Sequence, residues 1–126
     1  AVPRGSQIDA DACPEVAVIG GGPAGLMAAD AAAAGGARVV VFDAMASSGR
    51  KFLLAGKGGL NLTHAEPMPG FGARYGLAQL RLAPLLERYG AAEVRAFAAS
   101  LGIDTFVGSS ARVFPRDMKA APLLRR

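Results

Sequence analysis

Residues 16–43, VAVIGGGPAGLMAADAAAAGGARVVVFD, decide how the rest of this chain is interpreted. The stretch begins with the apolar run 16–19, which is typical of a parallel strand that is buried on both faces. Three glycines with the spacing G-x-G-x-x-G follow at once: Gly20, Gly22 and Gly25. At this spacing the first glycine permits a tight turn, the second lets the backbone approach a pyrophosphate, and the third lets a helix lie close to the sheet. The sequence therefore predicts a glycine-rich turn that leads from a strand into a helix.

A run of small residues, mostly alanine, follows the glycines and predicts a helix over residues 24–34. Free amides and the positive end of the dipole at the start of such a helix favour a phosphate. We therefore count Pro23 and Ala24, together with the three glycines, as candidate cofactor-binding residues. Gly35 and Gly36 are expected to end the helix, because glycine readily adopts positive φ.

A second apolar run, residues 39–42, ends at Asp43, which lies 18 residues beyond Gly25. An acidic side chain near this distance reaches the two hydroxyls of an adenosine ribose, and it would repel a 2′-phosphate. A lone G-x-G-x-x-G is weak evidence, but here the strand, turn, helix, second strand and acid occur in order. An alanine-rich α/β layer with an ordinary turn does not explain these positions. We therefore predict dinucleotide binding.

Residues 44–63, AMASSGRKFLLAGKGGLNLT, hold a second group of candidates. Four of them are well placed for phosphate contact after the chain leaves the ribose: Ser48, Gly49, Arg50 and Lys51. Arg50 offers a planar fork of donors and Lys51 a compact charge. The alternative for these two charges is an ordinary solvated loop.

The glycine cluster at residues 56–59 leaves the backbone with little side-chain cover, so that its amides can lie against a flat ring. The candidates near such a ring are Gly58, Gly59, Asn61 and Thr63. The Asn61 side chain can both donate and accept hydrogen bonds. His64 is the single histidine, and a loop histidine with local partners is a commoner role for it than substrate contact.

The middle of the chain predicts a surface segment and two helices. Prolines and glycines in residues 66–76 indicate an excursion over the surface. Leucines at helical spacing predict an amphipathic helix over residues 77–89, with Pro84 as a candidate break. The pattern repeats over residues 91–101, where we expect a second amphipathic helix.

The last part of the chain predicts a hairpin and a final helix. Residues 103–107 and 112–114 are short β-rich runs separated by glycine and serine. A helix is expected to begin at Pro115, although Pro122 conflicts with an uninterrupted helix there.

The composition indicates a globular protein. Of 126 residues, 52% are hydrophobic and 19% charged, which excludes a disordered chain and allows one domain with its own core. Asp30 and Arg38 interrupt the most apolar region, so we expect no membrane span and a cytoplasmic protein. Cys13 is the single cysteine, which excludes an internal disulfide, and no metal site is expected. The net charge of +4 is concentrated in the last fifteen residues, and we expect no nucleic-acid partner.

Three segments carry a resemblance to a known family: residues 18–29 (VIGGGPAGLMAA), 49–64 (GRKFLLAGKGGLNLTH) and 111–124 (ARVFPRDMKAAPLL). Together they resemble the amino-terminal part of a bacterial family of NAD(P)/FAD-dependent oxidoreductases, with aminoacetone-oxidase-like enzymes and relatives of bile-acid-derivative reductases. The first segment is shared by many flavoproteins with two dinucleotide-binding domains, whereas the other two are specific to this family. The commoner family loop reads SGGGRCN, and this chain has AGKGGLN at residues 55–61, which resembles a distinct branch.

The resemblance implies an α/β fold with a Rossmann-like FAD-binding βαβ start and a parallel sheet, followed by helices and a short β-hairpin. It implies that the three glycines hold the FAD pyrophosphate, that Asp43 holds the ribose, and that residues 58–63 lie near the flavin. It also implies a small-molecule substrate and NAD(P)H as a candidate electron donor, but it assigns no catalytic residue.

The resemblance also bears on the extent of the domain. Family members are several times longer than this chain, so residues 14–126 are expected to be the first part of an incomplete FAD-binding domain that runs into a substrate domain. Residues 1–13 contain VPRGS, which looks like the remnant of a cleavable expression tag, and a lead-in that we expect to be disordered.

Two other functions stay open alongside a flavin-dependent oxidoreductase. The strand-end acid suits an NAD-dependent dehydrogenase as well, although such a domain would usually continue with alternating strands and helices. A nucleotide-binding or interaction module without a reaction of its own is the third interpretation. In an incomplete domain, exposed apolar surface would also favour self-association.

Overall fold

A computed structural model describes residues 13–126 of the chain. The predicted tag remnant and lead-in at residues 1–13 therefore lie, apart from Cys13, outside the described residues. The chain forms two compact units, Ala1–Arg50 and Lys51–Arg126, and each is described by itself.

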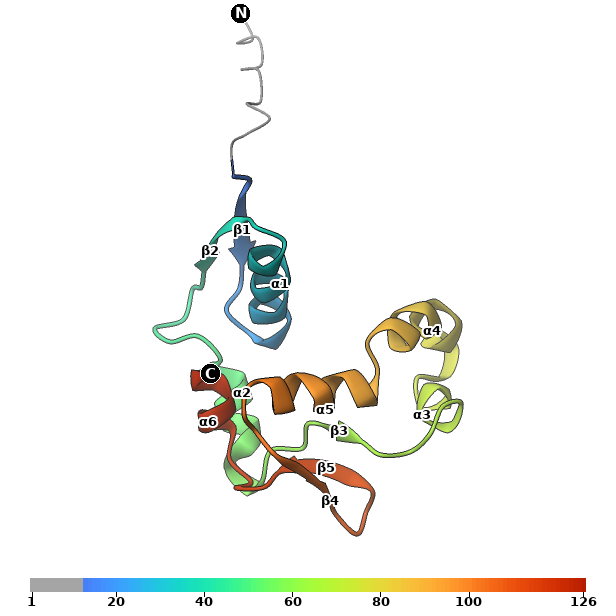
Figure 1. Ribbon diagram of the computed structural model, residues 1–126. Helices are drawn as coiled ribbons and strands as arrows, with labels where there is room; N and C mark the ends of the chain where they lie inside the picture. Colours follow the sequence, from blue (N-terminus) through green and yellow to red (C-terminus); the bar gives the residue numbers. More distant parts are fainter. Residues whose placement is uncertain (1–12) are drawn as a thin grey trace, which may run out of the picture. The chain divides into compact units, whose positions relative to one another are not determined.

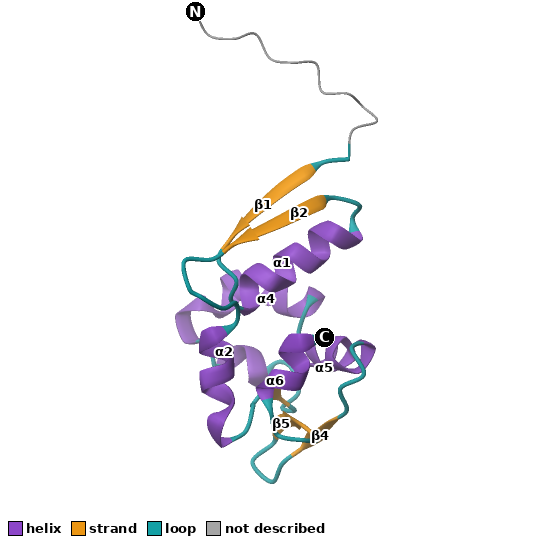
Figure 2. Ribbon diagram, turned by 90° about the vertical axis from the view of Figure 1, so that its left-hand side faces the viewer, coloured by secondary structure: helices purple, strands orange, loops and turns teal. Residues whose placement is uncertain are grey.

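The first unit is a strand, a helix and a second strand (Figure 1). β1 (Glu15–Ile19) and β2 (Arg38–Phe42) pair in parallel, with Val16 opposite Val39, and α1 (Pro23–Ala34) forms the crossover. Figure 2 shows the two strands side by side with α1 along one face of the pair. The predicted βαβ unit is confirmed. Its helix begins one residue earlier than expected, because the fixed φ of Pro23 suits the first position of a helix.

The two strands are covered on one face and exposed on the other. Burial alternates along both strands, with Val18 half-buried and Ile19 82% exposed. Phe42, at the end of β2, is 55% exposed. The prediction that the strand at residues 16–19 is buried on both faces is therefore wrong for the described residues, because α1 packs against one face of β1 only.

The second unit consists of short helices and a small antiparallel sheet (Figure 1). In chain order the elements are α2 (Arg50–Ala55), η1 (Gly56–Gly58), β3 (Thr63–His64), α3 (Gly70–Ala73), η2 (Gly76–Ala78), α4 (Gln79–Arg88), α5 (Ala91–Ser100), β4 (Thr105–Val107), β5 (Arg112–Pro115) and α6 (Ala120–Arg125). The sheet has the order β3-β5-β4, and both pairings are antiparallel. The hairpin predicted from the sequence is confirmed as β4 and β5, whereas β3 was not predicted.

The predicted helices of the second unit need two corrections, and the short helices α2 and α3 were not predicted. Pro84 does not divide α4, which runs through it from Gln79 to Arg88. The last helix does not begin at Pro115, which ends β5, but at Ala120. Pro122 consequently falls in the first turn of α6, where proline removes no helical hydrogen bond.

The core of the second unit lies where β5 meets the segments that flank it. Val113 in β5 is fully buried, and Leu60 is 3% exposed. The Leu62 amide donates to the Val113 carbonyl oxygen at 2.8 Å, which continues the pairing of β3 with β5. The segment after η1 is therefore part of the packed core and not a detached surface loop.

Candidate dinucleotide-binding site

The turn after β1 requires a glycine at its first position. Gly20 has a φ of +105°, a conformation that residues with a side chain rarely adopt. The Gly20 amide donates to the Phe42 carbonyl oxygen at 2.7 Å. The turn is thereby tied to the end of β2, beside the acid that follows that strand.

Gly25 allows α1 to approach this turn closely. A Cβ atom at Gly25 would lie 1.8 Å from the Gly20 carbonyl oxygen and 3.4 Å from Val18 Cγ1. No side chain fits at the first of these distances. The third glycine of the motif therefore has the packing role that the sequence predicted.

Gly22 differs from these two glycines because neither packing nor backbone conformation requires it. Its φ of −82° and ψ of −179° are extended backbone that any residue adopts. A Cβ atom there would meet no atom within 4 Å. The open space beside this backbone is what a closely bound ligand would use, so Gly22 fits the predicted pyrophosphate contact.

The start of α1 has amides to offer a ligand. In the described chain no side-chain hydrogen bond caps this helix, and its first internal bond joins the Leu26 amide to the Gly22 carbonyl oxygen at 2.9 Å. Pro23 has no amide hydrogen, but the Ala24 and Gly25 amides lie in the first turn, where a helix supplies no partner. Together with the positive end of the helix dipole, these groups favour an anion.

Asp43 is held against the glycine turn by two backbone amides. Its Oδ2 accepts a hydrogen bond from the Gly21 amide at 2.9 Å, and its Oδ1 accepts one from the Met45 amide at 2.9 Å. Each carboxylate oxygen has a second lone pair, so both oxygens can still accept bonds from a diol. Contact between Asp43 and a ribose stays a prediction.

Gly21 is a site residue that the sequence analysis missed. A Cβ atom at this buried glycine would lie 2.5 Å from Asp43 Oδ2 and 2.8 Å from Ser48 Oγ. Its carbonyl oxygen also accepts the Gly49 amide at 2.7 Å. The one available signal was the uninterrupted run of three glycines, of which the motif needs only the first and third.

The turn between β2 and α2 folds back over the glycine turn. Gly49 is buried and has a φ of +69°, so it also needs the conformational freedom of glycine. The structure thus brings eight of the predicted residues together in the first unit: Gly20, Gly22, Pro23, Ala24, Gly25, Asp43, Ser48 and Gly49.

Arg50 and Lys51 lie in a helix and not in the solvated loop that was the alternative for them. Both are exposed at the start of α2, an element that the sequence did not predict. Arg50 is the last residue of the first unit and Lys51 the first residue of the second. Their contact with a phosphate stays a prediction.

The glycine cluster of the second unit is partly packed and partly open. Gly59, with a φ of +112°, lies against Met118, because a Cβ atom there would be 2.6 Å from Met118 Cε. At Gly58 a Cβ atom would meet nothing within 4 Å, and Asn61 is exposed. Thr63 begins β3 and is half-buried. Gly58 and Asn61 are therefore the members of this group that are free to meet a ligand.

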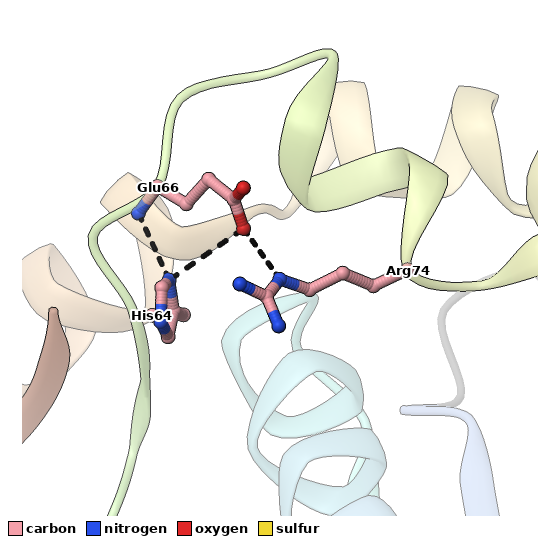
Figure 3. Close-up of polar contacts among 3 residues, drawn as sticks. All are labelled: His64, Glu66 and Arg74. Carbon is pink, nitrogen blue, oxygen red and sulfur yellow. Dashed lines mark hydrogen bonds and ion pairs between the residues drawn. The ribbon is translucent and has the colours of Figure 1, made fainter. Parts of the chain in front are cut away.

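His64 takes part in a local polar cluster (Figure 3). Its Nδ1 accepts the Glu66 amide at 3.2 Å, and the Glu66 carboxylate forms an ion pair with Arg74. These contacts fit a histidine with local partners, in a strand and not a loop. His64 and Glu66 also line an open cavity of about 400 Å³, so substrate contact stays open as the alternative for this histidine.

A comparison with protein families agrees with the geometry of the first unit. The family model of the HI0933-like protein Rossmann domain matches residues 14–126. The chain belongs to this family. The family is of the FAD-binding oxidoreductase type, so this HI0933-like domain is a dinucleotide-binding region with a Rossmann-like α/β fold. A search of curated proteins found no match.

The described residues hold neither a membrane-spanning helix nor a metal-binding cluster. Among residues 13–126 no helix is long and apolar enough to cross a membrane. The same residues contain no group of three or more histidine, cysteine, aspartate or glutamate side chains that could hold a metal ion.

Proposed function

We propose that this HI0933-like domain binds FAD through the first unit, with the glycine turn on the pyrophosphate and Asp43 on the adenosine ribose. The observation that carries the proposal is the contrast between Gly25, where a Cβ atom would lie 1.8 Å from the Gly20 carbonyl oxygen, and Gly22, where it would meet nothing within 4 Å. Packing within the unit explains the glycine at position 25, whereas a bound ligand would explain Gly22.

The charges and amides beside the turn support an anion at this place. The start of α1 carries no acidic residue in its first turn that would repel a phosphate. The amides of its first turn and the dipole of a helix of 12 residues both favour negative charge there. Arg50 and Lys51 are proposed as further phosphate contacts, because both are cationic and exposed.

The position of Asp43 supports an adenosine ribose with two free hydroxyls. Its carboxylate is fixed by the Gly21 and Met45 amides and needs no reorganisation to accept further hydrogen bonds. A 2′-phosphate at the same place would bring like charges together. We therefore propose FAD, and not a 2′-phosphorylated dinucleotide, as the ligand of this turn.

We propose that the flavin end of FAD lies at the segment of Gly58, Gly59, Asn61 and Thr63, with Gly58 and Asn61 as the residues free to meet it. Open backbone at Gly58 and an exposed amide side chain at Asn61 suit the edge of a flat heterocycle, which displays donors and acceptors. When bound, FAD would supply electron or hydride transfer, and the residues of this chain would bind and orient it. We propose a flavin-dependent oxidoreductase that acts on a small molecule with NAD(P)H as electron donor, of the aminoacetone-oxidase-like or bile-acid-derivative-reductase-like class.

The proposal is tested by titrating the purified chain with FAD. We expect flavin absorbance to co-elute with the protein and the melting temperature to rise, since FAD at a hundred times its Kd adds about 2.7 kcal/mol of stability. NAD in place of FAD is the matched comparison. Stabilisation by NAD alone would favour a dehydrogenase, and stabilisation by neither would refute dinucleotide binding.

A further inference from the structure

Met118 lies on the glycine cluster, although it is far from Gly59 in the sequence. Its Cε is 2.6 Å, and its Sδ 3.9 Å, from the place where a Cβ atom of Gly59 would stand. Its carbonyl oxygen accepts the amide of the next residue, Leu60, at 3.0 Å. Side chain and backbone of one residue thus fix two consecutive positions of the chain.

The backbone of Met118 is in an unusual conformation. Its φ is +62°, in the left-handed region that glycine prefers and that few other residues occupy. The turn is closed by a bond from the Met118 amide to the Pro115 carbonyl oxygen at 2.9 Å, and by the Lys119 amide, which donates to Asp117 Oδ1 at 3.1 Å. Because glycine would fit this φ without strain, the methionine side chain is the feature that needs a reason.

Neighbouring contacts make the same junction rigid. A Cβ atom at Gly56 would lie 2.6 Å from the Cβ atom of Ala120, which is 4% exposed. The two ends of the segment from Gly56 to Leu60 are therefore held, one by Ala120 and the other by the Met118 carbonyl. Between them Gly58 is open, with nothing within 4 Å of its Cβ position.

We propose that Met118 is a positioning residue that fixes Gly59 and Leu60, so that Gly58 and Asn61 present their free groups to the flavin. This inference rests on the proposed function, because it concerns the flavin end of FAD. Met118 acts through the glycine cluster and need not touch the cofactor. It is 37% exposed, so a structural role in the core alone would be weak.

Three substitutions separate side chain from backbone. Met118→Leu keeps a side chain of similar size over Gly59. Met118→Ala removes the side chain and keeps the backbone strain, whereas Met118→Gly removes the side chain and relieves the strain. The matched control is Met68→Ala, a methionine of the same unit that is 47% exposed and lies away from the glycine cluster.

The measurements are FAD affinity, ADP affinity, the visible spectrum of bound flavin and the amide exchange rate of Leu60. We expect Met118→Ala and Met118→Gly to speed Leu60 exchange about tenfold, to weaken FAD binding about threefold to tenfold, and to shift the flavin spectrum. ADP lacks the flavin, so its affinity should not change. Met118→Leu and Met68→Ala should behave as the unchanged chain does.

The outcomes distinguish this inference from the function on which it rests. If the unchanged chain binds no FAD, the proposed function fails and this inference fails with it. If the unchanged chain binds FAD, but the alanine and glycine variants bind it with the same affinity and spectrum, the positioning role alone is overturned. Faster Leu60 exchange with unaltered flavin would overturn that role as well, because it would show a purely structural contact. Should Met118→Ala unfold, Met118→Gly decides, since it removes the strain.

Discussion

Replacing either of two glycines in the same turn by alanine should have different consequences: Gly25→Ala should lower stability, whereas Gly22→Ala should weaken FAD binding. At Gly25 the new Cβ atom would stand 1.8 Å from the Gly20 carbonyl oxygen, whereas real Cβ atoms stay at least 3.0 Å from such a neighbour, so helix and turn must separate by about 1.2 Å. Moving α1 by this amount weakens its packing on both strands. At Gly22 the same atom would enter open space.

The size of the effect at Gly25 follows from two opposing contributions. Alanine stabilises a helix by up to about 1 kcal/mol relative to glycine, and this alone would make Gly25→Ala more stable. Inserting an atom into a packed place costs about 1–3 kcal/mol, and the upper end applies because the obstacle is backbone. We therefore expect Gly25→Ala to destabilise the first unit by about 2 kcal/mol.

Amide exchange of β1 and β2 in urea measures this stability in the first unit alone. We expect Gly25→Ala to lower it and Gly22→Ala to leave it within about 0.5 kcal/mol of the original value, since nothing in the unit contacts the added atom. In an FAD titration, Gly22→Ala should weaken binding at least about tenfold although the unit stays folded, because the methyl group occupies the approach to the pyrophosphate. A Gly25→Ala variant as stable as the original would refute the close packing of helix on turn.

Three other substitutions test further contacts. Asp43→Asn replaces one of two carboxylate acceptors by a donor, so it should destabilise the first unit by about 1–2 kcal/mol in urea amide exchange and weaken FAD binding in titration. Asp30→Asn, at an exposed position of α1, should change neither, and equal effects of the two variants would contradict the role of Asp43. Gly56→Ala should destabilise the second unit by about 1–3 kcal/mol in thermal unfolding, because the new Cβ atom would lie 2.6 Å from the Cβ atom of Ala120. An unchanged melting temperature would disprove this close packing. Arg74→Ala removes an ion pair with Glu66 in which the arginine side chain is more than half exposed, so the free energy of unfolding should fall by less than about 1 kcal/mol at low salt and by less still at about 1 M salt. A salt-independent loss of several kcal/mol would contradict a solvent-exposed ion pair.

The βαβ unit could be predicted because each of its signals is local. Strand, turn and helix follow from residues 16–43 alone, and the roles of Gly20 and Gly25 follow from one conformation and one close contact. The hairpin of β4 and β5 was equally local. The burial of the strands could not be predicted in the same way, since the exposure of Ile19 depends on which other elements pack on the sheet.

The second unit was harder to predict because its order comes from distant residues. Gly59 was interpreted as bare backbone, but Met118 covers it, and no spacing in the sequence reveals that contact. β3 has two residues and exists through pairing with β5. For Gly21 the need for glycine arises from Asp43 and not from its own neighbours, so a motif with one acid at its end did not identify it.

The most direct test of ADP binding by the first unit compares which backbone amides respond to ADP and which to FMN in NMR titrations of this chain. If the first unit holds the ADP half of FAD, ADP should shift the amides of Gly20, Gly21, Gly22 and Gly25 and leave those of Gly58 and Asn61 in place, while FMN should not shift the first group. Unmoved amides in the glycine turn at saturating ADP would contradict binding of the ADP half of FAD by the first unit.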